Sequence, residues 1–245
     1  MGARATLMTQ FIQRLTDRLA GEGFAPVPPL DGEGEAEPGT RSPAWRRVWF
    51  AASDSGIRCM TSGVMAHVDC GNRGELRIGG RAFIVAQVVE EVLEACRDLN
   101  SSVGAFSGGE IDSIPFGYFD NPLDASRKIS LSHEVDLDYA VNQFMRFVRG
   151  PVYRWFEQRS SVDKLSVLAR ASHPMDFDKV NPEPMRLRGC VILSVLADRV
   201  EDAASLMGWY LDQSQFHAWD SFEQAAAFDV ALGQQFPGYA RARGR

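Results

Sequence analysis

Three residues with catalytic chemistry lie close together in the run HVDCGN: His67, Asp69 and Cys70. A histidine beside a cysteine can lower the pKa of the thiol and make it a nucleophile. On an extended strand, however, His67 and Asp69 point to one side and Cys70 to the other, so the three side chains share a site only if the strand bends. A strand end followed by a turn at Gly71 and Asn72 is the plainer interpretation.

A second group of polar residues comprises His133, Glu134, Asp136 and Asp138. If this stretch is extended, its three carboxylates line one face and could bind a hard cation through oxygen ligands. If a helix starts at Asp136, the acidic residues are its cap and first turn, where they complement the helix dipole. We favour the helix start, and we expect neither a metal nor a cofactor.

A third group, His173, Asp176 and Asp178, lies in a proline-marked stretch, and its spacing matches no metal motif. It is typical of a solvated connection. The chain also contains no G-x-S-x-G elbow, no phosphate-binding Walker loop and no H-E-x-x-H pair. Hydrolase, NTPase and metalloprotease functions therefore have no local motif to support them.

Aromatic residues are frequent in the C-terminal half. Trp155, Trp209 and Trp219, together with Tyr210 and Phe216, could line a ligand groove or a partner-binding surface. Aromatic residues at helical spacing are more often part of a core. The three tryptophans are nevertheless the candidate binding residues.

Composition limits the classes of partner. A chain of 245 residues with 45% hydrophobic residues can bury a large core, and its net charge of −6 argues against a nucleic-acid-binding surface. The four cysteines are widely spaced and include no C-x-x-C pair, and no apolar run is long enough to span a membrane. We expect a cytoplasmic, bacterial protein with a protein partner and no contact with nucleic acid or membrane.

Hydrophobic patterning predicts an α+β fold: an N-terminal helix, a small antiparallel sheet and a helical C-terminal half. Four apolar residues at four-residue spacing form the first helix (Leu7, Phe11, Leu15 and Leu19), and a flexible acidic loop follows at 26–43. Strands are expected at 45–52, 57–68, 75–78 and 129–131, with a helix at 84–99 whose first residues could instead be strand. The lobes would be 1–130 and 131–245.

The helical half begins with the stretch 131–172, which predicts three short helices in series, the first ended by Gly150 and Pro151. Three further helices follow, and the first of these, 187–199, is apolar on nearly every side. Asp220 and Glu223 have the spacing of a capping box for the last helix, which Pro237 would end. The final arginines, Arg241, Arg243 and Arg245, read as a frayed basic tail.

The order of these elements resembles a family of uncharacterised bacterial α+β proteins that are known only as a domain of unknown function. The resemblance depends on Gly23, Phe24, Pro151, Trp155, Phe156 and Leu165. It implies a short N-terminal helix, an antiparallel sheet and a helical C-terminal part, and some members occur in settings that suggest toxin immunity or regulation. The acidic loop and the long extension after Arg186 depart from the family pattern.

Two functions remain open at this point. The first is a non-catalytic protein-binding factor of immunity or regulatory type. The alternative is an enzyme that uses a Cys/His site at His67–Cys70 or an acidic metal site at His133–Asp138.

Overall fold

The computed structural model describes residues 3–27, 45–52, 60–71, 75–104, 109–121, 128–172, 182–216 and 220–245. The chain divides into two compact units. Unit 1 comprises Met1–Ile84 and Ser113–Glu157, and unit 2 comprises Val85–Asp112 and Gln158–Arg245. This division differs from the expected lobes 1–130 and 131–245, because part of each expected lobe packs with the other.

The strands form a six-stranded sheet in the order β1-β2-β3-β4-β5, with β6 paired to β4. Their bounds are β1 Phe24–Val27, β2 Trp45–Ala52, β3 Thr61–Cys70, β4 Leu76–Val85, β5 Glu110–Pro115 and β6 Ile129–Leu131. The pairs β1–β2, β2–β3 and β4–β6 are antiparallel. The predicted α+β class, with an N-terminal helix, a small antiparallel sheet and a helical C-terminal half, is confirmed.

Strand β1 was not predicted. Pro26 and Val27, which were expected to open the acidic loop, instead pair with Phe50 and Trp49 of β2. A proline is tolerated on an edge strand because the side of the strand that faces no neighbour needs no N–H donor. Residues 28–43 of the expected loop lie outside the described part of the chain.

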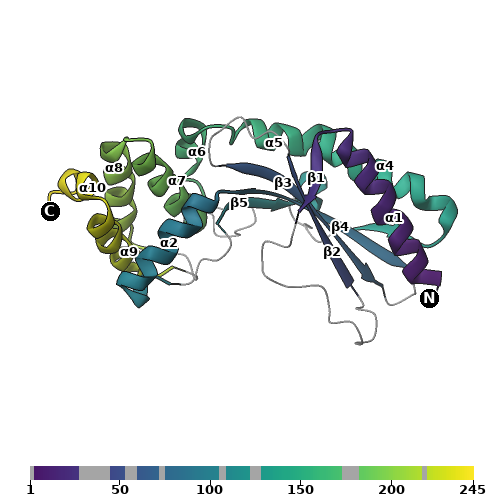
Figure 1. The fold of residues 1–245 in the computed structure, drawn as a ribbon, viewed down its shortest axis with the longest axis horizontal. Helices are drawn as coiled ribbons and strands as arrows, with labels where there is room; N and C mark the ends of the chain where they lie inside the picture. The colour runs from purple at the N-terminus through teal and green to yellow at the C-terminus, as the bar shows by residue number, and fades with distance from the viewer. Residues whose placement is uncertain are drawn as a thin grey trace. The chain divides into compact units, whose positions relative to one another are not determined.

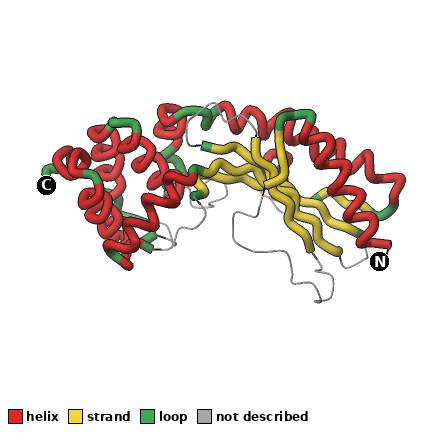
Figure 2. The backbone as a smooth tube through the Cα atoms, viewed as in Figure 1, coloured by secondary structure: helices red, strands yellow, loops and turns green. Residues whose placement is uncertain are grey.

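One face of the sheet packs against two helices of unit 1, α1 (Ala3–Ala20) and α4 (Leu137–Phe147) (Figure 1, Figure 2). On β4, this face is marked by Gly80, where a Cβ atom would lie 2.3 Å from the ring of Phe116. Phe116 in turn contacts Phe144 of α4, with their ring centroids 4.9 Å apart. On α1, the four apolar residues of the predicted stripe are all buried: Leu7, Phe11, Leu15 and Leu19.

The opposite face of the sheet carries a second aromatic contact. Trp49 of β2 meets Phe83 of β4 edge to face, with ring centroids 5.1 Å apart. Phe83 lies over Gly63 of β3, where a Cβ atom would come within 2.2 Å of the ring. Only glycine leaves room for this ring at position 63. Because side chains alternate along a strand, His67 and Asp69 point to the same face as Gly63.

The helical path after α4 continues where a break was expected. A π-helical turn, Val148–Val152, includes Gly150 and Pro151 and leads directly into α5 (Tyr153–Glu157). The prediction that Gly150 and Pro151 interrupt the helical path was therefore wrong, whereas the separate short helix predicted after Pro151 is present as α5. A π-turn has wider hydrogen bonding than an α-helix, and this accommodates a proline that lacks an N–H donor. A short helix, α3 (Gly117–Asp120), lies beside the end of α4, where Arg146 pairs with Asp120.

Unit 2 is helical. Its helices are α2 Gln87–Leu99, α6 Val162–Leu168, α7 Pro184–Leu196, α8 Val200–Leu211, α9 Phe222–Gln235 and α10 Pro237–Ala242. Helix α7 is buried almost all round and contacts α2, α6 and α8, as its apolar sequence predicted. Helix α2 starts after β4 has reached Val85, so the strand alternative for the first residues of the predicted helix holds.

Two predictions for the C-terminal region were wrong. The capping box of α9 is formed by Ser221 and Gln224, one residue after the expected pair Asp220 and Glu223. Pro237 does end α9, but it also starts α10, at the N1 position that proline favours. The tail beyond is not frayed, because two of its arginines bind a buried carboxylate in α9.

That carboxylate is Asp229, whose side chain is fully buried. It accepts hydrogen bonds from the hydroxyl of Tyr239, from Arg243 Nη2 at 3.1 Å and from Arg245 Nη2 at 2.6 Å. Arg243 Nη1 also donates to the carbonyl of Ala204 in α8, at 3.4 Å. The basic C-terminal residues thus attach α10 to both α8 and α9.

Candidate functional site

The α1–α4 surface of unit 1 carries a regular series of polar contacts. Gln10 Nε2 donates to Glu134 Oε1 at 3.1 Å, Arg14 Nη1 contacts Asp138 Oδ1 at 2.5 Å, and Arg18 Nη2 donates to Asn142 Oδ1 at 3.0 Å. Each pair is separated by 124 residues in the chain. Equal steps of four residues on both helices mean that α1 and α4 run parallel and in register.

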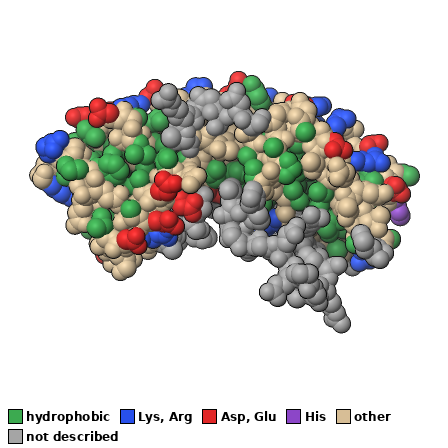
Figure 3. Space-filling view, viewed as in Figure 1, with side chains coloured by type: hydrophobic (Ala, Val, Ile, Leu, Met, Phe, Trp, Pro, Cys, Tyr) green, Lys and Arg blue, Asp and Glu red, His purple; other side chains and the backbone are tan. Residues whose placement is uncertain are grey.

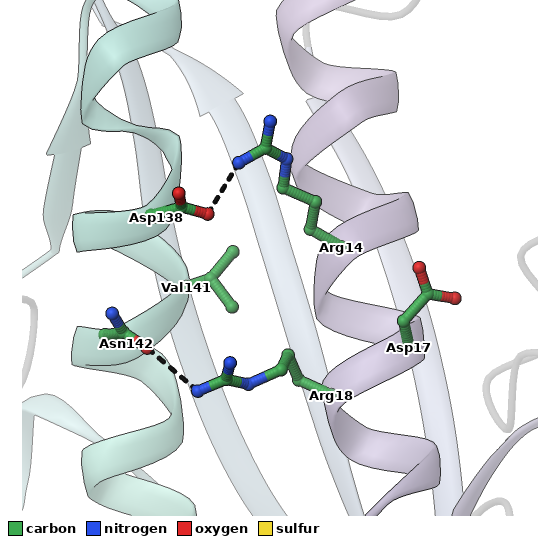
Figure 4. Close-up of a pocket in the computed structure, with 6 residues that line it drawn as sticks. All are labelled: Arg14, Asp17, Arg18, Asp138, Val141 and Asn142. Atoms are coloured by element: carbon green, nitrogen blue, oxygen red, sulfur yellow. Dashed lines mark hydrogen bonds and ion pairs between the residues drawn. The ribbon is translucent and has the colours of Figure 1, made fainter.

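A shallow cavity of about 410 Å³ lies between the two helices. Figure 4 shows Arg14 and Arg18 reaching from α1 towards Asp138 and Asn142 on α4, with Val141 between the two bridges and Asp17 pointing elsewhere. Asp138 is 79% exposed, so its ion pair with Arg14 contributes little to stability. The cavity offers two guanidinium groups and two carboxylates, but no histidine, cysteine or serine that could act as a nucleophile or a base near pH 7.

Beside the cavity, α4 and the turn before it expose a stripe of four residues that we term the α4 face: Val135, Tyr139, Asn142 and Arg146. Spacings of four, three and four residues place them on one side of the helix. Val135 is 88% and Tyr139 62% exposed, and Arg146 is 61% exposed. Figure 3 shows acidic, basic and hydrophobic side chains close together over α1 and α4, without a large patch of one charge.

The first predicted cluster does not form a Cys/His site. His67 and Asp69 lie on the sheet face away from α1 and α4, half-buried, whereas Cys70 points to the other side at the exposed strand end. Asp69 pairs with Lys128. Burial, followed by the charge of Lys128, lowers the pKa of His67 below 6.5; Asp69 opposes this shift and Arg47 adds to it. The neutral imidazole is thus favoured, on the wrong side of the strand to activate the thiol.

The second predicted cluster is a helix start. Glu134–Asp136 form a single 3-10 turn, and α4 begins at Leu137 with Asp136 as its N-cap residue. The side chain of Asp136 makes no capping hydrogen bond. Glu134 and Asp138 both turn towards α1 and bind Gln10 and Arg14, so the acidic residues serve the contact between the helices.

The predicted aromatic residues belong to different parts of the chain. Trp155 is buried in α5 of unit 1 and contacts Phe156, with ring centroids 5.5 Å apart. Trp209 is half-buried in α8 of unit 2, where the guanidinium of Arg170 lies 5.1 Å from its ring. Trp219 lies outside the described residues, as do His173, Asp176 and Asp178. Trp155 therefore belongs to unit 1 and Trp209 to unit 2.

Buried ion pairs in unit 2 were not predicted from the sequence. Asp112 Oδ2 accepts from Arg159 Nε at 2.6 Å and lies 3.1 Å from Arg186 Nε, and all three side chains are at most 5% exposed. Arg186 Nη1 donates to the carbonyl of Leu168 at 3.2 Å, while its Nη2 has no hydrogen-bond partner in the described part of the chain. Burial lowers the pKa of Arg159, and the charge and hydrogen bond of Asp112 oppose that shift.

A second buried pair joins α7 to the segment before α9. Arg188 Nε donates to Asp220 Oδ2 at 3.2 Å, and Arg188 Nη1 donates to the carbonyl of Val103 at 2.7 Å. The hydroxyl of Tyr210 donates to the same carboxylate at 2.9 Å. Burial and the charge of Asp220 raise the pKa of Tyr210. This network holds four segments of unit 2 together, the 3-10 turn after α2, α7, α8 and the segment before α9, and its groups are deeply buried.

A sequence signal for these pairs did exist. Arg186 and Arg188 interrupt an otherwise apolar helix, and a charged residue at a buried position requires a partner. The sequence could not identify the partners of these arginines, because Asp112 and Asp220 lie in segments that are distant along the chain. Two cysteines lie in the same region, and burial raises the pKa of Cys96 to about 11 and that of Cys190 to about 12. Neither thiol is activated as a nucleophile.

Comparison of the chain with protein-family models, curated proteins and solved structures gave no match in any of the three. Within the described residues, no helix combines the length and apolar character that a membrane crossing requires. Among the same residues, no three His, Cys, Asp or Glu side chains gather where they could hold a metal ion.

Proposed function

We propose that this protein is a non-catalytic protein-binding factor of immunity or regulatory type, and that it binds its partner through the α4 face. The observation that carries the proposal is the exposure of Val135 and Tyr139, one helical turn apart, beside the polar α1–α4 cavity. Contiguous apolar surface rimmed by polar groups marks surfaces that another protein covers, and Val135 and Tyr139 lie next to each other on one side of the helix.

The types of residue on this surface support the same conclusion. Tyrosine and arginine are enriched among the residues that contribute most to binding energy, and the α4 face contains Tyr139 and Arg146. Because α1 and α4 are fixed to each other and to the sheet, the surface is rigid before binding. A rigid surface loses little conformational entropy when a partner binds.

The chemistry of the described residues gives less support to an enzyme. His67 and Cys70 point to opposite sides of β3, and two of the carboxylates near His133, Glu134 and Asp138, turn towards α1. The buried Asp112 and Asp220 are occupied by arginines. The groups with catalytic potential therefore lie apart or are engaged in structural contacts.

Affinity capture from the native host tests the proposal. A double variant, Val135→Ser with Tyr139→Ser, is compared with wild type and with Val167→Ser as a matched control. Val167 is 80% exposed on α6 of unit 2, so the control removes an equally exposed valine elsewhere. We expect wild type and the control to retain one protein in stoichiometric amount, and the double variant to lose it. Identical captured proteins for all three baits would contradict the proposal.

A further inference from the structure

We propose that the α4 face also binds a second copy of this chain, in an antiparallel arrangement about a two-fold axis beside Asn142. The inference rests on the function proposed above in one respect, that this face is a protein-binding surface. Its starting point is the order of charges along the helix. Glu134, Asp136 and Asp138 lie at the N-terminal end, and Arg146 and Arg149 lie at the C-terminal end.

The spacing of these charges makes the face complementary to itself. Asp138, at the edge of the α4 face towards α1, and Arg146 on the face each lie four residues from Asn142, in opposite directions, which is about 6 Å along the helix axis. A two-fold axis at Asn142 therefore brings Asp138 of one copy level with Arg146 of the other, and symmetry forms the same pair a second time.

The direction of the pairing follows from the same charges. In a parallel arrangement Asp138 would face Asp138 and Arg146 would face Arg146, so like charges would repel. The charge order also complements the helix dipole of α4. That role accounts for the acidic first turn and the basic last turn, but not for the exposed apolar surface of Val135 and Tyr139 in the same stripe.

The dimer should be weak, because Asp138 and Arg146 already have partners within the same chain. Asp138 is paired with Arg14 and Arg146 with Asp120, but they keep 79% and 61% of their side-chain surface exposed and can accept a second partner. Arg18, bonded to Asn142, lies level with the axis, so the two Arg18 side chains repel each other. An interface built on one helix face is at the small end of specific interfaces.

Sedimentation analysis of charge-reversed variants tests the inference, at chain concentrations from about 10 µM to about 1 mM to cover weak association. We expect wild type to form dimers with increasing concentration, and Asp138→Arg and Arg146→Asp each to remain monomeric. An equimolar mixture of these two variants should associate again, because both symmetry-related contacts in the mixed pair join opposite charges. Glu201→Arg, at an exposed position on α8, should behave as wild type.

Circular dichroism checks that each variant is folded, as we expect because both side chains are exposed. A wild type that stays monomeric throughout, single variants that dimerise as wild type does, or a mixture that stays monomeric would each overturn the inference. The sedimentation and capture experiments can fail independently of each other. A captured partner without self-association overturns this inference alone, whereas self-association without a captured protein overturns the proposed function alone.

Discussion

At the scale of single residues, the most consequential groups are the charges that the chain buries. Arg188 and Asp220 are at most 1% exposed and satisfy each other together with Tyr210 and the carbonyl of Val103. A charge buried without its partner is far more costly than one that is exposed. The stability of unit 2 therefore depends on pairs that are distant in sequence.

Replacing Asp220 by alanine should leave the buried Arg188 guanidinium without its carboxylate partner. We expect the free energy of unfolding to fall by about 3–5 kcal/mol, as is typical when one partner of a buried pair is removed. Asp202→Ala serves as the control, because Asp202 pairs with Arg199 at the surface, and it should cost at most about 1 kcal/mol. Urea denaturation measures both. Equal, small losses would show that Arg188 reaches water or another partner.

His67 should make stability depend on pH in a defined direction. Its pKa in the folded chain lies below 6.5, chiefly because of burial and the charge of Lys128. As the pH falls below 6.5, the unfolded chain takes up a proton at this position before the folded chain does, so folding stability declines; above 6.5 this contribution is fully present.

The variant His67→Gln should lose this part of the pH dependence, which urea midpoints at pH about 7.5 and about 5.5 would measure. NMR titration of the His67 ring measures the pKa directly. A folded-state pKa above 6.5 would contradict the account of its surroundings.

Local side-chain directions could be predicted from the sequence, whereas long-range ion pairs could not. The alternation of β3 correctly separates His67 from Cys70, since side-chain direction on a strand is a local property. The partners of Arg159, Arg186 and Arg188 come from segments brought together only by folding, and no spacing in the sequence encodes them. The bridges from Arg14 and Arg18 to α4 were unpredictable for the same reason.

At the scale of elements, periodic hydrophobic patterns predicted the long helices well. The apolar stripe of α1 and nearly all of α7 are buried as expected, because the distribution of apolar residues around a helix determines how much of its surface packs against the core. The errors concern ends and short elements. Strand β1 has four residues and one proline, and the π-turn at Gly150 keeps a helical path through two residues that usually end one. In both cases packing overrides local preference.

The N-terminus of α9 gives a test at this scale. Ser221 accepts from the backbone N–H of Gln224, and the Gln224 side chain accepts from the N–H of Ser221, so Ser221→Ala removes half of a reciprocal cap. We expect a loss of about 1 kcal/mol in the free energy of unfolding. Ser214→Ala, at an exposed turn after α8, should change it by less than about 0.5 kcal/mol. An equal effect of both substitutions would argue against the cap.

At the scale of the whole molecule, each unit has its own means of holding its elements together. In unit 1, a sheet carries two parallel helices joined by exposed polar bridges, and the α4 face remains open beside them. In unit 2, α7 packs against α2, α6 and α8, and buried arginines bind carboxylates in segments that are distant in sequence. The open apolar and polar groups of unit 1, rather than the buried charges of unit 2, are thus available to a partner.

We propose that another protein covers the α4 face. The most direct measurement places a photo-crosslinking amino acid at position 139, or at position 167 as the control, and irradiates the native host. We expect a discrete covalent adduct with a partner polypeptide from position 139 and none from position 167. No adduct from position 139, or the same adducts from both positions, would contradict it.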